Sequence, residues 1–169
     1  MKWIAISGSW RLTSEKVESD VRKEVADIIK DGDGIVSGGA LNVDYFATDE
    51  AMKLNKDFKQ IKIFLPTTLD IYAAHYRKRA DEGVITHDQA EELIAQLSRL
   101  KEINPESIIE NKINKIVDKT TYFERNMQVV NAADELLAFH VNGSDGVQDT
   151  INKAREKGIP VKVIEYAIS

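Results

Sequence analysis

Short apolar runs alternate with longer amphipathic stretches toward both ends of the chain. Five runs of this kind occur, at residues 2–7, 35–37, 61–66, 135–141 and 159–166. They are too short for typical helices and contain few polar positions. Strands with nearly continuous apolar runs are typical of a parallel sheet with both faces covered. The pattern therefore predicts a buried, mainly parallel sheet of about five strands.

The stretches between these runs carry apolar residues at helical spacing. After the first run, Val17, Val21, Val25 and Ile29 repeat every four positions, and Thr13 or Ser14 can cap the helix they define. The same spacing predicts helices at residues 42–55 and within 142–158. Strands that alternate with helices favour an α/β fold. We expect a Rossmann-like three-layer sandwich.

The middle of the chain, residues 67–134, is mostly helical in pattern and rich in charge. The stretch "THDQAEELIAQLSRL" opens with a capping box, Thr86 to Gln89. Its apolar stripe must be buried against the body or a second subunit, so we expect a homodimer or a higher homo-oligomer. The stripe consists of Ala90, Leu93, Ile94, Leu97 and Leu100. We interpret residues 1–169 as a single Rossmann-like nucleotide-binding domain with a helical insertion at about 82–120.

Composition narrows the classes of function. The 169 residues are 43% hydrophobic and 30% charged, which suits one domain with a real core. The absence of cysteine excludes disulfides, thiolate zinc sites and a cysteine nucleophile, and fits the cytoplasmic location that we expect. No apolar run approaches the ~20 residues that span a bilayer, so we expect no membrane partner. The start of the chain resembles a strand rather than a signal peptide.

Charge and histidine spacing bear on partners. The net charge of −5 disfavours non-specific nucleic-acid binding, although a local basic patch would allow it. The only dense basic run is "HYRKR", residues 75–79, which we interpret as the solvated face of a helix. His75, His87 and His140 lack metal-ligand spacing. We therefore expect no metal and no further cofactor.

Three loops that leave strands carry small residues: Gly8–Arg11, Ser37–Ala40 and Asn142–Gly146. In an open parallel sheet, ligands bind at the carboxyl ends of the strands. Glycine allows the backbone to approach a phosphate, and a helix N-terminus offers unpaired N–H groups. The loops therefore predict an anion site. The Gly-x-Gly-x-x-Gly and Walker A patterns are absent, so the sequence lacks the motifs that usually indicate hydride transfer or ATP hydrolysis.

Four segments carry a resemblance to a known family. They are "ISGSWR" at 6–11, "SGGALNVDYFATDEA" at 37–51, "FERNMQVVNAADELLAF" at 123–139 and "GSDGVQDTINKAREKGIPVKV" at 143–163. Together they resemble the SLOG superfamily, which includes DNA-processing protein A and the "lonely guy" cytokinin-activating enzymes. The resemblance implies a Rossmann-like fold that binds a nucleotide or a nucleotide-derived ligand across these loops.

The chain also departs from these relatives. Trp10 separates Gly8-Ser9 from Arg11, and Asn42 stands where glycine is usual, although asparagine tolerates a left-handed backbone. Arg125 is similar to the arginine of the phosphoribohydrolase branch, but Thr150 stands where that branch has its catalytic glutamate. A threonine cannot stabilise an oxocarbenium-like transition state as a carboxylate does.

These observations favour a nucleotide-binding sensor or carrier. An enzyme that cuts or transfers at an N-glycosidic bond is the first alternative, and a DNA-binding protein similar to DNA-processing protein A is the second. The catalytic residue is open, with Asp44, Glu124 and Arg125 as candidates. The residues that we expect to bind the ligand are Ser7, Gly8, Ser9, Arg11, Ser37, Gly38, Gly39, Ala40, Asp44, Arg125, Asn126, Gly143, Ser144 and Gly146.

Overall fold

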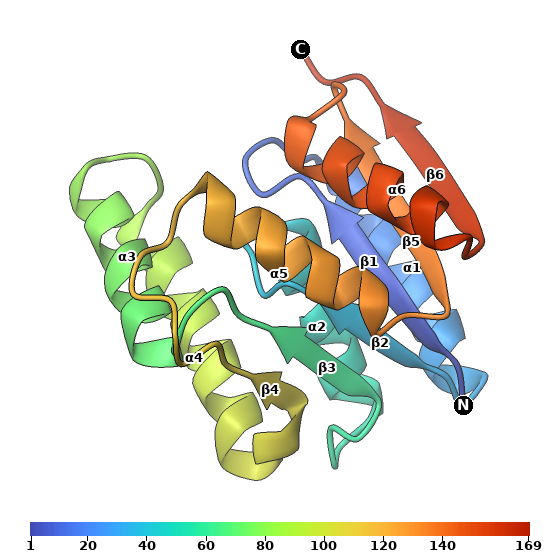
Figure 1. Cartoon of the computed structure of the whole chain (residues 1–169), viewed down its shortest axis with the longest axis horizontal. Coiled ribbons are helices and arrows are strands. Elements are labelled where there is room, and N and C mark those ends of the chain that lie inside the picture. The colour runs from blue at the N-terminus through green and yellow to red at the C-terminus, as the bar shows by residue number, and fades with distance from the viewer.

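Six parallel strands form one sheet in the order β4–β3–β2–β1–β5–β6 (Figure 1). The computed structural model describes all 169 residues. The strands are β1 (Trp3–Gly8), β2 (Gly34–Ser37), β3 (Ile61–Phe64), β4 (Ile108–Ile109), β5 (Glu135–Val141) and β6 (Val161–Tyr166). The expected α/β fold is confirmed, with one strand more than predicted. The two residues of β4 are too few to show a hydrophobic period.

Helices cover both faces of this sheet. They are α1 (Glu15–Lys30), α2 (Val43–Leu54), α3 (Leu69–Asp81), α4 (His87–Ile103), α5 (Lys119–Asn131) and α6 (Asp145–Lys157), with a 3₁₀ turn η1 at Pro105–Ser107. In Figure 1, α5 and α6 lie in front of the sheet and α1 and α2 behind it, while α3 and α4 stand beyond β3 and β4. None of these helices combines the length and the apolar character needed to cross a bilayer.

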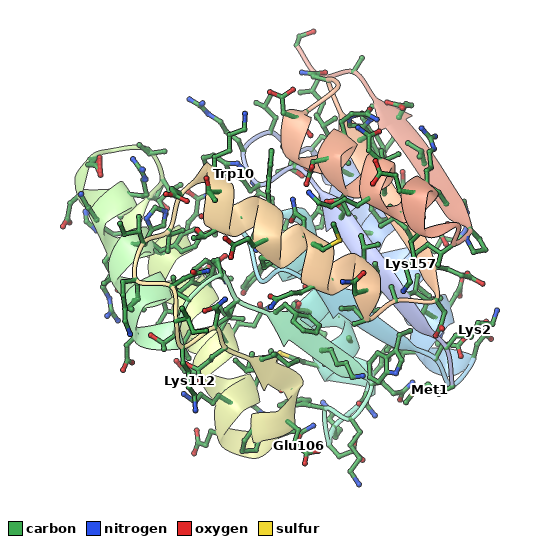
Figure 2. All side chains as sticks on the ribbon, viewed as in Figure 1. Met1, Lys2, Trp10, Glu106, Lys112 and Lys157 are labelled. Atoms are coloured by element: carbon green, nitrogen blue, oxygen red, sulfur yellow. The ribbon has the colours of Figure 1, made fainter.

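Burial on both faces explains why the strands are continuously apolar. In β1, Ile4 and Ile6 join the large core under α1 and α2, whereas Ala5 joins the smaller core under α5 and α6. Successive side chains of a strand point to opposite faces, so both sets must be apolar when both faces are covered. Lys157 ties α6 to α5, because its ammonium donates to the carbonyls of Val130, Asn131 and Ala133 at 2.9 Å each (Figure 2).

Four helices begin with a side-chain cap. Ser14, Thr68, Thr86 and Asp118 each accept a backbone N–H from the first turn of α1, α3, α4 and α5. The capping box predicted at Thr86 and Gln89 is confirmed. Helices α2 and α6 begin without a side-chain cap. The first backbone N–H groups of α2 and α6 therefore have no side-chain acceptor, unlike those of the other four helices.

The apolar stripe of α4 is buried within the chain. Four of its five residues, Ala90, Leu93, Leu97 and Leu100, belong to the large core, and Ile94 is partly buried. The methyl carbon Leu97 Cδ2 even reaches the bend at Gly39, at the end of β2. The stripe thus supports the strand ends, and most of it is covered within the chain. It no longer argues for the homo-oligomer that we expected.

This packing makes α4 a part of the core, and Leu97→Ala tests it. We expect a loss of about 2–5 kcal/mol in the free energy of unfolding, because the side chain is fully buried and its removal leaves a cavity. Urea unfolding measures the loss, and sedimentation before and after the change reports the oligomeric state. Ile94→Ala is the matched control, with a smaller expected loss. Equal, small losses accompanied by dissociation would show instead that the stripe is an intermolecular surface.

Candidate functional site

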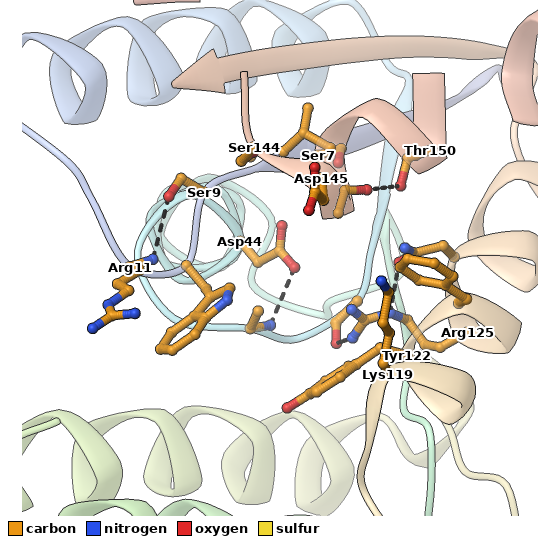
Figure 3. A pocket seen from close by; sticks show the side chains of 18 of the residues that line it. Ser7, Ser9, Arg11, Asp44, Lys119, Tyr122, Arg125, Ser144, Asp145 and Thr150 are labelled. Carbon is orange, nitrogen blue, oxygen red and sulfur yellow. Dashed lines mark hydrogen bonds between the residues drawn. The ribbon is translucent and has the colours of Figure 1, made fainter. Parts of the chain in front are cut away.

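A cleft of about 780 Å³ opens at the carboxyl ends of β1, β2 and β5 (Figure 3). The chain builds β2, β3 and β4 on one side of β1 and then crosses over to place β5 and β6 on the other. Such a switch in strand order leaves a crevice where α/β proteins bind ligands. Its volume lies in the usual range for small-molecule sites. The three loops singled out in the sequence are brought together here.

Eleven of the fourteen predicted binding residues line this cleft. They are Ser7, Gly8, Ser9, Arg11, Gly38, Ala40, Asp44, Arg125, Asn126, Ser144 and Gly146. Ser37, Gly39 and Gly143 do not line it. The catalytic candidate Glu124 also lies outside, where its carboxylate accepts the amide of Asn114 at 3.1 Å.

The glycines of the β1 and β2 loops are required by packing inside the protein. A Cβ on Gly8 would lie 2.4 Å from Val43, at the start of α2, and a Cβ on Gly38 would lie 2.4 Å from the guanidinium carbon of Arg125. Gly39 has φ +67°, and its Cβ would meet Ile63 at 2.9 Å. The sequence suggested that these glycines make room for a phosphate. The space beside them holds other parts of the chain.

The amides of the β2 loop are largely used by the chain itself. The N–H of Ala40 donates to Asp44 Oδ2 at 3.1 Å, and the N–H of Gly39 lies 3.4 Å from the Ser37 hydroxyl. Asp44 is almost fully buried, and this burial raises the pKa of its carboxyl, although the Arg125 guanidinium and the loop amides work in the opposite direction. A carboxylate thus occupies the place where we expected the loop to hold an anion.

Arg125 reaches this loop from α5. Its Nη1 donates to the carbonyl oxygen of Gly38, and its Nε donates to Asn126 Oδ1 at 3.2 Å. The amide of Asn126 donates in turn to Asp149 of α6 at 3.2 Å, and Lys153 contacts the same carboxylate. The guanidinium is therefore held in place from both helices of the front layer.

The loop before α6 forms another part of the cleft lining. Ser144 directly precedes the helix, and its hydroxyl oxygen is buried without a hydrogen-bond partner. His140, at the end of β5, faces the Ser144 carbonyl through Nε2 at 3.2 Å and Glu165 through Nδ1 at 3.3 Å. Asp145 is the first helical residue. The start of α6 thus presents uncapped N–H groups beside an unpaired hydroxyl.

The wall facing these loops comes from α3 and α5, and the sequence did not reveal it. His75, Tyr76 and Arg79 line the cleft from α3. Lys119 and Tyr122 line it from α5 (Figure 3). The rings of His75 and Tyr76 lie 5.7 Å apart, edge to face. Part of the "HYRKR" run that we interpreted as a solvated face therefore belongs to the site. The sequence feature that could have indicated this wall is the histidine and tyrosine at the start of the run, since these side chains are less typical of a fully solvated face than lysine and arginine.

Two further features limit the chemistry of the cleft. Thr150, which stands where the phosphoribohydrolase branch has its glutamate, is buried in the cleft lining and donates its hydroxyl to the Gly146 carbonyl at 3.1 Å. No group of three or more His, Asp or Glu side chains is arranged to share a metal ion. Asp44 is the buried carboxylate of the cleft.

Comparison with known proteins identifies the fold. No family model and no curated protein matches the sequence. Among solved structures, DNA processing protein A from Helicobacter pylori, described for its single-stranded DNA binding mode, superposes with a TM-score of 0.69 at 21% identity over 96% of this chain. DNA processing protein A from Streptococcus pneumoniae gives 0.68 at 19% identity over 99%. The molybdenum cofactor carrier protein from Chlamydomonas reinhardtii gives 0.58 at 13% identity over 100%, and 91% of that protein is covered.

The chain has the fold of DNA processing protein A. This likeness confirms the Rossmann-like fold that the resemblance to the SLOG superfamily implied. The present chain spans 64% and 52% of the length of the two DNA processing proteins. The likeness establishes the fold of this chain, and any function of the cleft has to be argued from its side chains.

The raised pKa of Asp44 predicts that this carboxylate destabilises the folded protein at neutral pH. The folded state binds the proton more tightly than the unfolded state, so stability falls as the pH rises from the ordinary value of 3.8 toward the folded pKa. Asp44→Asn should therefore raise Tm at pH 7 by a few degrees, because about 1 kcal/mol shifts Tm by about 2–4 °C in a domain of this size. Thermal melts from pH 3 to 8 measure the difference, which should close below about pH 4. A constant difference across this range would contradict the assignment.

Proposed function

We propose that the cleft binds a nucleotide or a nucleotide-derived ligand, with its phosphate at the N-terminus of α6. One observation carries this proposal: α2 and α6 are the helices that begin without a side-chain cap, and both begin at the cleft. Uncapped N–H groups and the helix dipole favour an anion there. The Ala40 amide, just before α2, is already used by Asp44, which leaves α6 for the ligand.

The exposed positive charges of the cleft lining favour an anionic ligand. Arg11, Arg79 and Lys119 contribute these charges, while Asp118 and Asp145 add exposed carboxylates and Asp44 adds a buried one beside the β2 loop. An ionised Asp44 repels a phosphate, and the unpaired hydroxyl of Ser144 can donate to one at the start of α6. A sensor or carrier role fits this arrangement, because the cleft offers binding groups and has Thr150 in place of a catalytic glutamate.

Gly146→Glu tests the phosphate site. Nothing lies within 4 Å of a Cβ at this position, so the side chain fits, and a carboxylate in the first helical turn stabilises a helix. The variant should fold at least as stably as wild type yet lose the thermal shift caused by inorganic phosphate and by nucleoside mono- and diphosphates. For a real ligand at 100 times Kd the stabilisation is about 2.7 kcal/mol, which is several degrees in Tm.

Gly146→Gln is the matched control, because it has the same shape without the charge. It should retain most of the shift, apart from any loss caused by crowding. A short single-stranded oligonucleotide belongs in the same series, since two proteins of this fold process DNA. If the phosphorylated ligands stabilise Gly146→Glu as well as wild type, the phosphate does not bind at α6.

Hydrolysis or transfer at an N-glycosidic bond is the second candidate, and Asp44 is the observation that favours it. A carboxylate of raised pKa in a cleft beside an arginine can serve as an acid or a base. Incubation of the protein with each nucleotide that binds, followed by chromatography for the free base, checks this activity. Release of base should vanish in Asp44→Asn. Release that survives in this variant would exclude Asp44 as the catalytic group, and no release by wild type supports the binding role.

A further inference from the structure

The floor of the cleft holds two buried side chains of opposite charge that do not touch each other. Asp44 and Arg125 are 6% and 8% exposed, and both line the cleft. Arg125 is close enough to favour the ionised form of Asp44 and so to oppose the rise of its pKa. It nevertheless forms no ion pair with any carboxylate. Buried charges are ordinarily paired, since an unpaired one is costly. This pair is held apart.

Each member is fixed by neighbours that use only part of its hydrogen-bonding capacity. Asp44 accepts the Ala40 amide on Oδ2 at 3.1 Å, and the Gly38 amide also stabilises its carboxylate, which leaves part of the acceptor capacity of two carboxylate oxygens unused. Arg125 donates to Gly38 and Asn126, which leaves three of its five N–H groups without an acceptor. The chain therefore keeps unused acceptor capacity on Asp44 and unused donors on Arg125 in the lining of the same cleft.

We propose that a neutral polar part of the ligand bridges these two residues, donating a hydrogen bond to Asp44 and accepting one from Arg125. This inference rests on the proposed phosphate site at α6 and specifies the other end of the ligand. A second anion does not fit between them, because Asp44 repels it. A purely apolar group would leave the remaining donors of Arg125 and the remaining acceptor capacity of Asp44 unused. The bridging group therefore has a donor and an acceptor next to each other.

Two parts of a nucleotide have this chemistry. Sugar hydroxyls donate and accept through the same atom, and the amide edge of a base such as guanine places an N–H beside a C=O. Both would use Asp44 as the acceptor and Arg125 as the donor. Ribose 5-phosphate, 2-deoxyribose 5-phosphate, GMP and AMP separate the two, because the first pair lacks the base and the second pair shares the sugar.

Titration calorimetry of wild type and Asp44→Asn with these four compounds and inorganic phosphate tests the bridge. The asparagine keeps its oxygen for Ala40 and turns an N–H toward the cleft, so the ligand donor loses its acceptor. We expect the affinity for the bridging compounds to fall tenfold or more, while the affinity for inorganic phosphate stays the same or rises. A fall shared by ribose 5-phosphate assigns the bridge to the sugar. A fall confined to GMP assigns it to the base edge.

Asp145→Asn is the matched control, because it also removes a negative charge from the cleft lining. It should raise the affinity for phosphate and for the sugar phosphates alike. If Asp44→Asn behaves in the same way, or changes no affinity, the bridge is overturned even though binding at α6 stands. If the phosphate affinity itself is insensitive to Gly146→Glu, the proposed function fails first, so the two failures are distinguishable.

Discussion

The contact between the Arg125 guanidinium and the Gly38 carbonyl holds the cleft in its shape. It joins the front helix layer to the end of β2, across the sheet edge where ligands bind in this fold. With Arg125 in this position only glycine fits at residue 38, because a Cβ would lie 2.4 Å from the guanidinium carbon and displace it. Asn126 of α5 accepts from the same arginine and donates in turn to Asp149 of α6. One buried cation thus links both front helices to the β2 loop.

The architecture was predictable because its cause is local in the sequence. Continuous apolar runs and helical stripes report burial on two faces of a sheet, and Ile4, Ala5 and Ile6 are buried on alternate faces as this requires. Strand β4 was not predicted, because its two residues are too few to show a hydrophobic period. The partner of the α4 stripe was not predicted either, since a periodic stripe shows that a helix face is covered without showing what covers it.

The site was predictable only in outline. Gly-rich bends after strands indicated which loops meet, and they do meet at one cleft. What each glycine is for depends on contacts between distant segments, such as Gly8 with Val43 and Gly38 with Arg125. The same limit applies to His75 and Tyr122, which are far apart in sequence and whose rings lie 6.4 Å apart in the cleft wall. The spacing of polar residues along a helix does not show whether its polar face lies in solvent or in the wall of a cleft.

Two parts of the cleft lining differ in a way that stability alone does not explain. Capping α6 as α1, α3, α4 and α5 are capped, and pairing or removing the buried Asp44, would each stabilise the fold. Instead the uncapped start of α6 and the buried Asp44 and Arg125 line one cavity. The start of a helix favours a negative group, whereas an ionised Asp44 repels one. The proposed nucleotide would therefore place its phosphate at α6 and its neutral donors and acceptors at Asp44 and Arg125, so these two features would fix its direction in the cleft.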